Sequence, residues 1–145
     1  MPSRGAGPSS RTAAWVIDGT TGMLTRVAPG DGRTTRRSLN TAGDLSSVAT
    51  GGGYAWITDD TLDVVWRVSQ DLHVTSIPVG ARPDDVVCAN GNVWVANYDD
   101  GSVSKVDPGL AQELMRYPVG IRPRALAAAN GKVRVVGDVF GLANS

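Results

Sequence analysis

An internal repeat of about 40 residues constrains the fold of this chain more than any other feature of its sequence. The segment PVGARPDDVVCANGNVWVANYDDGSVSKVDP, residues 78–108, is followed by PVGIRPRALAAANGKVRVVGD, residues 118–138. The Val-Gly, Arg-Pro and Asn-Gly pairs of these two segments lie 40 residues apart. Further upstream, Trp15, Trp56 and Trp94 follow one another at steps of 41 and 38 residues. A fixed period of this length indicates a repeat architecture, in which each unit packs against its neighbours.

Each repeat unit has the pattern of four short β-strands. In the clearest unit we expect strands near residues 84–89, 93–97, 102–106 and 113–117. Asn90-Gly91, between the first two strands, suits a two-residue hairpin turn because both residues tolerate positive φ. The segment GLAQELMRY before the end of the unit has helical propensity. Its equivalent in the previous unit, HVTSIPVG, is strand-like, so the repeat favours a strand there.

Four-stranded units of about 40 residues are typical of the blades of a β-propeller. We therefore predict an all-β chain, with a disordered lead-in or linker at residues 1–13 and propeller repeats over residues 14–145. The predicted blade units cover residues 14–39, 45–77, 83–118 and, in part, 123–138. The first unit lacks its innermost strand and the last has only its first two. About three four-stranded blades are thus expected, a partial or half propeller.

An incomplete ring leaves two interpretations open, because known propellers close with four or more blades. The favoured interpretation is that the chain is an excerpt of a longer propeller. The alternative is a homo-oligomer in which two chains complete one ring, although this arrangement would duplicate one strand. In both cases the chain alone would expose blade faces and strand edges.

Two segments carry a resemblance to a known family. VWVANYDDGSVSKVDP, residues 93–108, and PVGIRPRALAAANGKV, residues 118–133, resemble the YVTN or YncE-like propeller repeat, which is related to NHL repeats and streptogramin lyases. The resemblance covers roughly residues 14–138 and implies a β-propeller. It implies little about activity, because such propellers serve many functions. Repeats of this family often lie beside kinase, regulator or solute-binding domains, which favours part of a larger sensor, regulatory or envelope protein.

Charge and composition exclude several partner classes. The 14 basic and 14 acidic side chains cancel, so the whole chain has no electrostatic attraction for nucleic acid or anionic membrane. Six arginines fall within the first 40 residues without the set of aromatic platforms that nucleic-acid sites use. No apolar segment is long enough to span a bilayer, and the first residues lack a signal peptide. The location stays open between the cytoplasm and export as part of a larger protein.

Cys88 is the single cysteine of the chain, which excludes an intrachain disulfide and a Cys-based zinc site. Its apolar neighbours Val86, Val87 and Ala89 predict a small core residue. No cofactor is expected.

The resemblance to streptogramin lyases implies His and Glu side chains near the central channel and a bound magnesium ion. His73 and Glu113 are the only His and Glu of this chain, and both fall on the fourth, outermost strand of their units. A general base must lie within hydrogen-bond reach of its proton, which the rim of a propeller does not offer. We therefore predict no catalytic residues. A partial lyase-like or lactonase-like enzyme, with its catalytic blades outside this chain, is the alternative.

Two groups of residues are candidates for a binding site on one loop-rich face. The acidic pairs Asp59-Asp60 and Asp99-Asp100, with Asp18 in the matching place, lie in the turns after the second strands. Hairpin-turn hydrogen bonds explain these carboxylates better than a calcium site, so no metal is predicted. Arg82 and Arg122 lie in loops on the same face, where they could clamp a carboxylate or phosphate or pair with the aspartates. The predicted binding residues are Arg82, Arg122, Asp59, Asp60, Tyr98, Asp99 and Asp100.

Trp15, Trp56 and Trp94 hold equivalent positions on the second strands. Packing between adjacent blades explains this better than a ligand cage, and we expect Trp56 and Trp94 to be largely buried. Taken together, the sequence predicts a non-catalytic module that binds a protein or a small ligand of unknown identity. A structural repeat fragment without a separate function is a further alternative.

Overall fold

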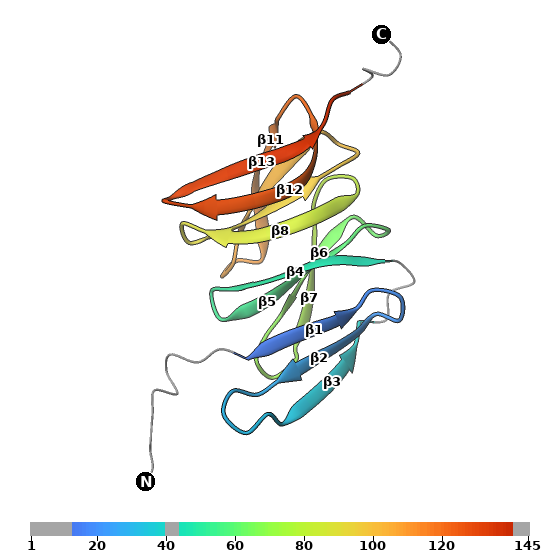
Figure 1. Cartoon of the computed structure of the whole chain (residues 1–145), viewed down its shortest axis with the longest axis vertical. Helices are drawn as coiled ribbons and strands as arrows, with labels where there is room; N and C mark the ends of the chain where they lie inside the picture. Colours follow the sequence, from blue (N-terminus) through green and yellow to red (C-terminus); the bar gives the residue numbers. More distant parts are fainter. Residues whose placement is uncertain (1–12, 40–43, 141–145) are drawn as a thin grey trace.

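All regular elements in the described residues of the chain are β-strands. The computed structural model describes residues 13–39 and 44–140, which contain thirteen strands. These strands form four antiparallel sheets that follow one another along the long axis of the molecule (Figure 1). The arrangement confirms the predicted all-β fold with successive propeller blades. The described part of the chain holds no helix with the length and hydropathy needed to cross a membrane.

Two of the sheets are complete four-stranded blades. The second blade consists of β4 (Leu45–Gly51), β5 (Tyr54–Asp59), β6 (Val64–Val68) and β7 (Val74–Pro78), paired in this order. The third blade consists of β8 (Pro83–Ala89), β9 (Asn92–Asn97), β10 (Ser102–Asp107) and β11 (Gln112–Pro118). The conformation of β11 confirms that the repeat, and not local helical propensity, decides the structure of this segment.

The two end blades are incomplete. The first consists of β1 (Ala14–Asp18), β2 (Met23–Val27) and β3 (Thr34–Ser38), and the fourth of β12 (Arg122–Ala129) and β13 (Lys132–Asp138). By register, β1 corresponds to β5 and β9, so the first blade lacks the innermost strand among its described residues. The fourth blade has the two innermost strands. Of the predicted lead-in at residues 1–13, all but Ala13 lies outside the described residues.

The innermost strands β4, β8 and β12 lie side by side across the blades (Figure 1). One carboxylate on β8 links them, because Asp85 Oδ1 accepts a hydrogen bond from Ser47 Oγ at 2.8 Å and Asp85 Oδ2 accepts one from the Leu126 N–H at 2.8 Å. Each innermost strand has a register shift at the same place in the repeat. The shift lies between Leu45 and Ser47 in β4, between Pro83 and Asp85 in β8, and between Pro123 and Ala125 in β12. Such bulges bend a strand, and here they repeat with the blades.

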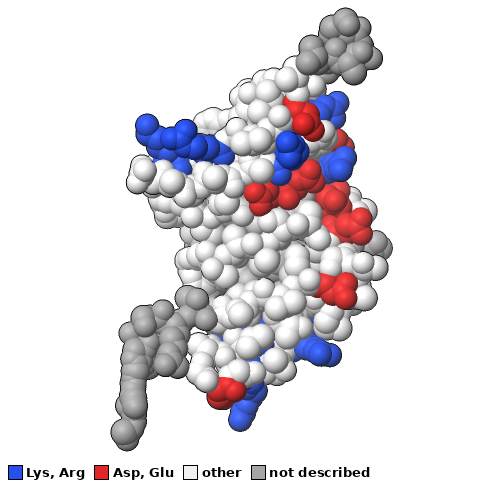
Figure 2. All heavy atoms as spheres, in the orientation of Figure 1, with Lys and Arg blue, Asp and Glu red and all other residues white. Residues whose placement is uncertain are grey.

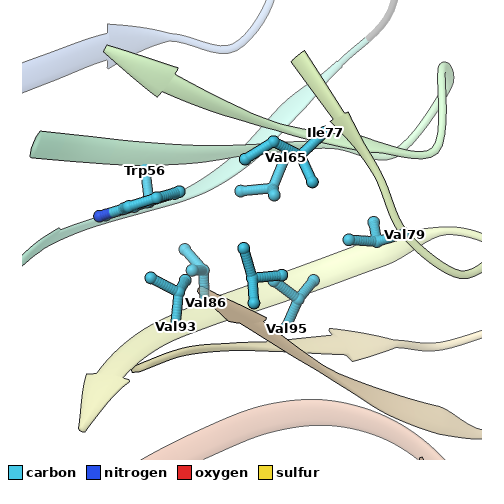
Figure 3. Packing of buried hydrophobic residues seen from close by; sticks show 8 residues of the cluster. Trp56, Val65, Ile77, Val79, Val86, Val93 and Val95 are labelled. Atoms are coloured by element: carbon cyan, nitrogen blue, oxygen red, sulfur yellow. The ribbon is translucent and has the colours of Figure 1, made fainter. Parts of the chain in front are cut away.

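The hydrophobic core consists of three clusters, each between two successive blades. Figure 3 shows the cluster between the second and third blades. It contains Trp56, Val65, Ile77 and Val79 on one side and Val86, Val93, Val95 and Val106 on the other. Leu24, Ile57 and Val68 belong to the cluster between the first and second blades, and Ala96, Val103 and Leu126 to the cluster between the third and fourth. Because successive strand residues point to opposite faces, an inner blade contributes to two clusters.

The repeated tryptophans pack between blades, as their register predicts. Trp56 is fully buried, and its Nε1 donates a hydrogen bond to the Gly51 carbonyl at 3.0 Å. Trp94 Nε1 donates to the Ala89 carbonyl at 3.2 Å in the same way. Trp94 and Trp15 are half-buried, so the predicted packing between blades is confirmed for Trp56 and Trp94, with Trp94 less completely covered. The reason is that the blade facing Trp94 has two described strands, whereas a complete blade has four.

Candidate binding face

The turns after the second strands and the loops into the innermost strands lie together at one end of the blades. In the third blade the Tyr98 N–H donates to the Arg82 carbonyl at 2.8 Å, and the Asp99 N–H donates to the Ala81 carbonyl at 3.2 Å. In the second blade the Asp60 N–H donates to the Asp44 carbonyl at 3.1 Å. These bonds hold each turn against its entry loop. We call the surface formed by residues 60–63, 81–85, 98–101 and 121–124 the turn face.

Tyr98 lies between the two arginines that the sequence singled out. The guanidinium carbon of Arg82 is 5.0 Å from the centre of the Tyr98 ring, and that of Arg122 is 5.7 Å away. These are cation–π distances. The Tyr98 hydroxyl donates to Asp138 Oδ2 at 2.6 Å, which connects the third blade to the fourth. Tyr98 is therefore the centre of a cluster that spans two blades.

Both arginines also contact carboxylates. The sequence left open whether they bind a ligand or pair with aspartates, and in the structure they pair with aspartates. Arg82 Nε is 3.6 Å from Asp84 Oδ1, and Arg122 Nη1 is 3.3 Å from Asp99 Oδ1. The side chains of Arg82 and Arg122 remain 51% and 38% exposed. At this exposure the ion pairs contribute little to stability, and the guanidinium groups stay accessible to a ligand.

Carboxylates outnumber guanidinium groups on and beside the turn face. Figure 2 shows acidic side chains as a band along one edge of the molecule, with basic side chains among them near the upper end. Burial raises the pKa of Asp60, and the nearby carboxylate of Asp44 raises it further. Burial also raises the pKa of Asp84, although Arg82 opposes the shift. Both carboxyl groups therefore lie where additional positive charge would be stabilising.

Asp59 is not part of the exposed surface, which corrects its assignment as a binding residue. Its side chain is fully buried, and Oδ1 accepts hydrogen bonds from the N–H groups of Thr61 and Leu62 at 3.1 and 3.0 Å. Its Oδ2 accepts one from Trp66 Nε1 at 3.2 Å. Asp59 stabilises the turn from within. Asp18 accepts the equivalent backbone hydrogen bonds in the first blade.

The strand register places Asn97, and not Asp99, at the position of Asp59. Asn97 pairs with Pro83 of the innermost strand, as Asp59 pairs with Leu45. Tyr98 is therefore the equivalent of Asp60, and the two acidic pairs are not equivalent to each other. Residues 98–101 form a turn with a hydrogen bond of 3.4 Å from the Gly101 N–H to the Tyr98 carbonyl. This confirms the predicted hairpin turn at Asp99-Asp100-Gly101.

Asp100 belongs to a polar network that runs into the third blade. Its Oδ2 is 3.3 Å from Arg116 Nη1 and accepts a hydrogen bond from Ser102 Oγ at 3.2 Å. Buried Asn97 donates through Nδ2 to Ser102 Oγ and Ser104 Oγ at 3.0 and 2.9 Å, while its Oδ1 has no partner among the described residues. Asp100 therefore connects the turn face to the blade interior.

Several charged residues on or beside this surface were missed by the sequence reasoning, among them Asp84, Arg124 and Asp138. Arg124 Nε lies 3.4 Å from Asp138 Oδ1, next to the Tyr98 cluster. Asp84 and Arg124 each follow one of the repeated Arg-Pro pairs. Their equivalent place in the repeat was a signal that could have identified them.

The two residues considered for catalysis lie at the outer side of two different blades, and only Glu113 is on an outermost strand as predicted. His73 is exposed and directly precedes β7, and Glu113 lies on β11, where it accepts hydrogen bonds from Arg116 at 2.9 Å. Within residues 13–39 and 44–140, no three His, Cys, Asp or Glu side chains lie close enough to hold a metal ion.

Cys88 is half-buried and lies at the opposite end of the blades from the turn face, beside a cavity of about 320 Å³. Burial raises its pKa to about 11, so the side chain is a thiol at neutral pH. The packing is close, since a Cβ at Gly51 would lie 2.6 Å from the Cys88 sulfur. Cys88 is therefore a packing residue at the edge of the core.

No family model matches the chain, and no curated protein matches it. Several solved structures do. Hydrazine synthase of Kuenenia stuttgartiensis matches with a TM-score of 0.76 and 16% identity, over 89% of this chain and 40% of that one. Virginiamycin B lyase from Staphylococcus aureus matches with a TM-score of 0.68 and 13% identity, and the match covers 86% of this chain and 52% of the lyase. YCF48, in a structure with a bound D1 peptide, matches with a TM-score of 0.61 and 19% identity, and the match covers 88% of this chain and 45% of YCF48.

The chain thus spans about half the length of these similar chains, or less. At such low identity the likeness shows the fold alone. The YVTN or YncE-like assignment stays a prediction, and what the comparisons establish is that the chain has the fold of a partial β-propeller.

Proposed function

We propose that the chain is a non-catalytic binding module that presents the turn face to a protein or small-ligand partner. The observation that carries this proposal is the cluster of Arg82, Tyr98 and Arg122. The cluster combines an aromatic ring with two exposed guanidinium groups, and Tyr and Arg are enriched among the residues that dominate binding interfaces. Its side chains are held by contacts within and between blades, which reduces the ordering entropy lost on binding.

The charge of the surroundings indicates a partner that carries positive groups. Asp60 and Asp84 lie beside the cluster, and the pKa of each is raised because burial disfavours the carboxylate. A cationic partner would stabilise these carboxylates and would associate faster at low ionic strength. The bound peptide in the YCF48 structure supports a polypeptide as the partner class.

A role within a larger protein is part of the proposal, because the chain matches only 40 to 52% of the similar chains. Sensor, regulatory and envelope proteins are the classes that we propose, in the cytoplasm or exported. The module, for which we propose no metal and no cofactor, would then supply recognition and leave any chemistry to other domains.

A peptide titration of the full chain tests the proposed function. Three 12-residue peptides, rich in Lys, rich in Asp or built from Ser and Gly, are added to the ¹⁵N-labelled protein. We expect the Lys-rich peptide to shift the amide signals of residues 81, 82, 84 and 85 and of residues 98–101. Tyr98→Ala should weaken its binding about tenfold, the effect of losing one interface anchor. Tyr117→Ala removes an exposed tyrosine elsewhere and should leave the affinity unchanged. Shifts confined to other surfaces would contradict the proposal.

A partial lyase is the second candidate, and the likeness to virginiamycin B lyase favours it. This function would require catalytic side chains outside the present chain. Incubation of the chain with virginiamycin B, followed by mass spectrometry, separates the two functions. We expect no reaction product, and a product formed at a rate proportional to protein concentration would favour the enzyme.

A further inference from the structure

Arg82 has a backbone conformation that residues other than glycine rarely adopt. Its φ is 55°, in the left-handed region, where the Cβ atom crowds the backbone. Its repeat equivalent Arg122 is not left-handed, and in that loop Gly120 has the positive φ instead, at 76°. Strain of this kind persists only where the surrounding structure holds the residue, and it is concentrated at functional sites. The contacts that hold Arg82 therefore bear on its role.

Two hydrogen bonds fix the backbone of Arg82, one from each neighbouring turn. Its N–H donates to Asp63 Oδ1 in the turn of the second blade, at 2.9 Å. Its carbonyl accepts a hydrogen bond from the Tyr98 N–H in the third blade, at 2.8 Å. Asp63 is itself anchored, because its carbonyl accepts a hydrogen bond from the Val79 N–H at 3.1 Å. The carboxylate of Asp63 is thus the side-chain group that holds the backbone of Arg82.

The residues equivalent to Asp63 in the first and third blades are glycines. Gly22, Asp63 and Gly101 each directly precede the third strand of their blades, and their φ values are 74°, 59° and 63°. The carbonyls of Gly22 and Gly101 accept hydrogen bonds from Leu39 and Val119 at 3.0 Å each, as that of Asp63 does from the equivalent residue. A left-handed φ favours glycine, so the turn itself does not require an aspartate. The carboxylate is what the second blade adds.

The guanidinium group of Arg82 has unused donors. Its carbon lies 5.0 Å from the centre of the Tyr98 ring, and its Nε is 3.6 Å from Asp84 Oδ1, beyond hydrogen-bond length. It donates no hydrogen bond to any residue within 13–39 and 44–140, whereas Arg122 Nη1 donates to Asp99 Oδ1 at 3.3 Å. A planar fork of N–H groups matches the two oxygens of a carboxylate or of a phosphate. Arg82 is therefore placed to accept an anionic group of a ligand.

The charges around Arg82 favour a carboxylate over a phosphate. Burial raises the pKa of Asp84, and the nearby carboxylates of Asp60 and Asp99 raise it further against the opposing charge of Arg82. These aspartates would repel a phosphate dianion more strongly than a single carboxylate. A carboxylate flanked by cationic groups would contact Arg82 and bring its positive neighbours toward the aspartates.

We propose that Asp63 is a positioning residue that holds Arg82 for recognition of one carboxylate of the partner polypeptide, within a segment that is otherwise basic. Asp63 acts through the Arg82 N–H and does not contact the partner. The inference rests on the proposed function, to which it adds the charge pattern of the partner segment and the arginine that binds its carboxylate.

The first experiment uses the full chain without a partner. A proton above an aromatic ring is shielded, so the Nε–H signal of Arg82 should lie upfield of that of an unstacked arginine, and Tyr98→Ala should remove the shift. Asp63→Gly should move the signal toward the unstacked position, although the turn is kept as in the equivalent glycine turns. Asp63→Asn retains an oxygen acceptor and should leave the signal in place. An Arg82 signal that Asp63→Gly does not move would overturn the role of Asp63.

The second experiment measures the charge pattern of the partner. Two 12-residue peptides of Lys, Ser and Gly have either Glu or Gln at the centre, and fluorescence anisotropy gives their affinities. We expect the Glu peptide to bind about fivefold more tightly, the effect of one hydrogen-bonded charge pair at an exposed site. Asp63→Gly and Arg82→Gln should both remove this difference, and Asp63→Asn should keep it. Arg122→Gln changes the repeat equivalent and should also keep it.

The outcomes separate this inference from the proposed function. Equal affinity of the two peptides would overturn the inference and leave the proposed function standing. If neither peptide binds, the proposed function and the partner's charge pattern both fail. Inorganic phosphate is the third ligand, and a shift of the Arg82 signal at concentrations as low as those of the Glu peptide would overturn the assignment of a carboxylate.

Discussion

Two interfaces of the molecule have the same strand register but bury their residues to different extents. One lies between the second and third blades, and the other between the third and fourth. Ile77 pairs with Val65, and Tyr117 pairs with Val103 in the equivalent place. Ile77 is 1% exposed, whereas Tyr117 is 37% exposed. The third blade covers Ile77 with four strands, and the fourth blade presents only two described strands to Tyr117. At this pair of positions, burial thus follows the completeness of the neighbouring blade.

The first blade shows the same effect at the other end of the molecule. Val16 pairs with Thr25, as Ile57 pairs with Trp66. Ile57 is fully buried against the first blade, but Val16 is 56% exposed because no described blade precedes it. An equivalent sequence position therefore predicts orientation well and burial only where both neighbours are present.

The tryptophans offer the largest test of this comparison. Trp56→Ala should lower the free energy of unfolding by about 3–5 kcal/mol, the range for deleting a large buried aromatic side chain. Trp94→Ala should lower it by about 1–3 kcal/mol, because the loss scales with the apolar area removed from water. Urea denaturation of both variants measures the difference. Equal losses, with unchanged m-values, would show that the two interfaces are packed alike.

The outermost strands provide the next largest difference. Ile77→Ala should lower the free energy of unfolding by about 2–4 kcal/mol. Tyr117→Ala should lower it by about 1 kcal/mol, since Tyr117 mainly stacks on Trp94, with ring centres 6.3 Å apart. Thermal and urea denaturation should rank the two variants in this order. A larger loss for Tyr117→Ala would mean that the third blade's open face is covered in solution.

The strands of this fold were predictable because their determinants are local and repeated. Asn90-Gly91 encodes a hairpin turn by its φ preferences, and φ is positive at both residues. The repeat also corrected a local ambiguity at β11, where helical propensity alone pointed to the wrong element. The bulges of the innermost strands were only partly signalled by the sequence, because a proline marks the bulges of β8 and β12 but not that of β4.

The candidate site was predictable in part. Arg82 and Arg122 were identified because their Arg-Pro pairs repeat, but the contacts of Tyr98 with both depend on how two blades are placed. Asp59 was misassigned because a carboxylate in a turn has the same sequence signature whether it bonds the turn or faces solvent. The strand register, and with it the equivalence of Asp59 and Asn97, requires the backbone pairing of the structure.

The turns of the second and third blades differ in a way that mutation can measure. Asp59→Ala should lower the free energy of unfolding by about 1–3 kcal/mol, because it leaves two backbone N–H groups and the indole N–H of Trp66 without this acceptor. Asp59→Asn keeps one oxygen acceptor and should cost less. Urea denaturation gives both values. If the two variants lose the same stability, the hydrogen bonds to the oxygens are not the cause.

The smallest expected effect concerns the equivalent positions Asp60 and Tyr98. Tyr98 lies between two arginines, while burial and the nearby Asp44 raise the pKa of Asp60 above its usual 3.8. The folded state then binds this proton more tightly than the unfolded state, so stability falls as pH rises from about 4 through the raised pKa. Asp60→Asn should therefore raise the thermal midpoint at pH 7, and the gain should disappear below pH 3.8.

Asp71 is the matched control for this pH dependence, because a hydrogen bond from Ser69 lowers its pKa and reverses the sign. A lowered pKa in the folded state stabilises the protein above the usual pKa and loses this contribution as pH falls. Asp71→Asn should therefore lower the midpoint slightly at pH 7 and have no effect in strong acid. Calorimetric scans of both variants between pH 3 and 7 give the two curves. If both variants lowered the midpoint at pH 7, the environment of Asp60 on the turn face would not disfavour its carboxylate. The proposal of a cationic partner would then lose one of its supporting observations.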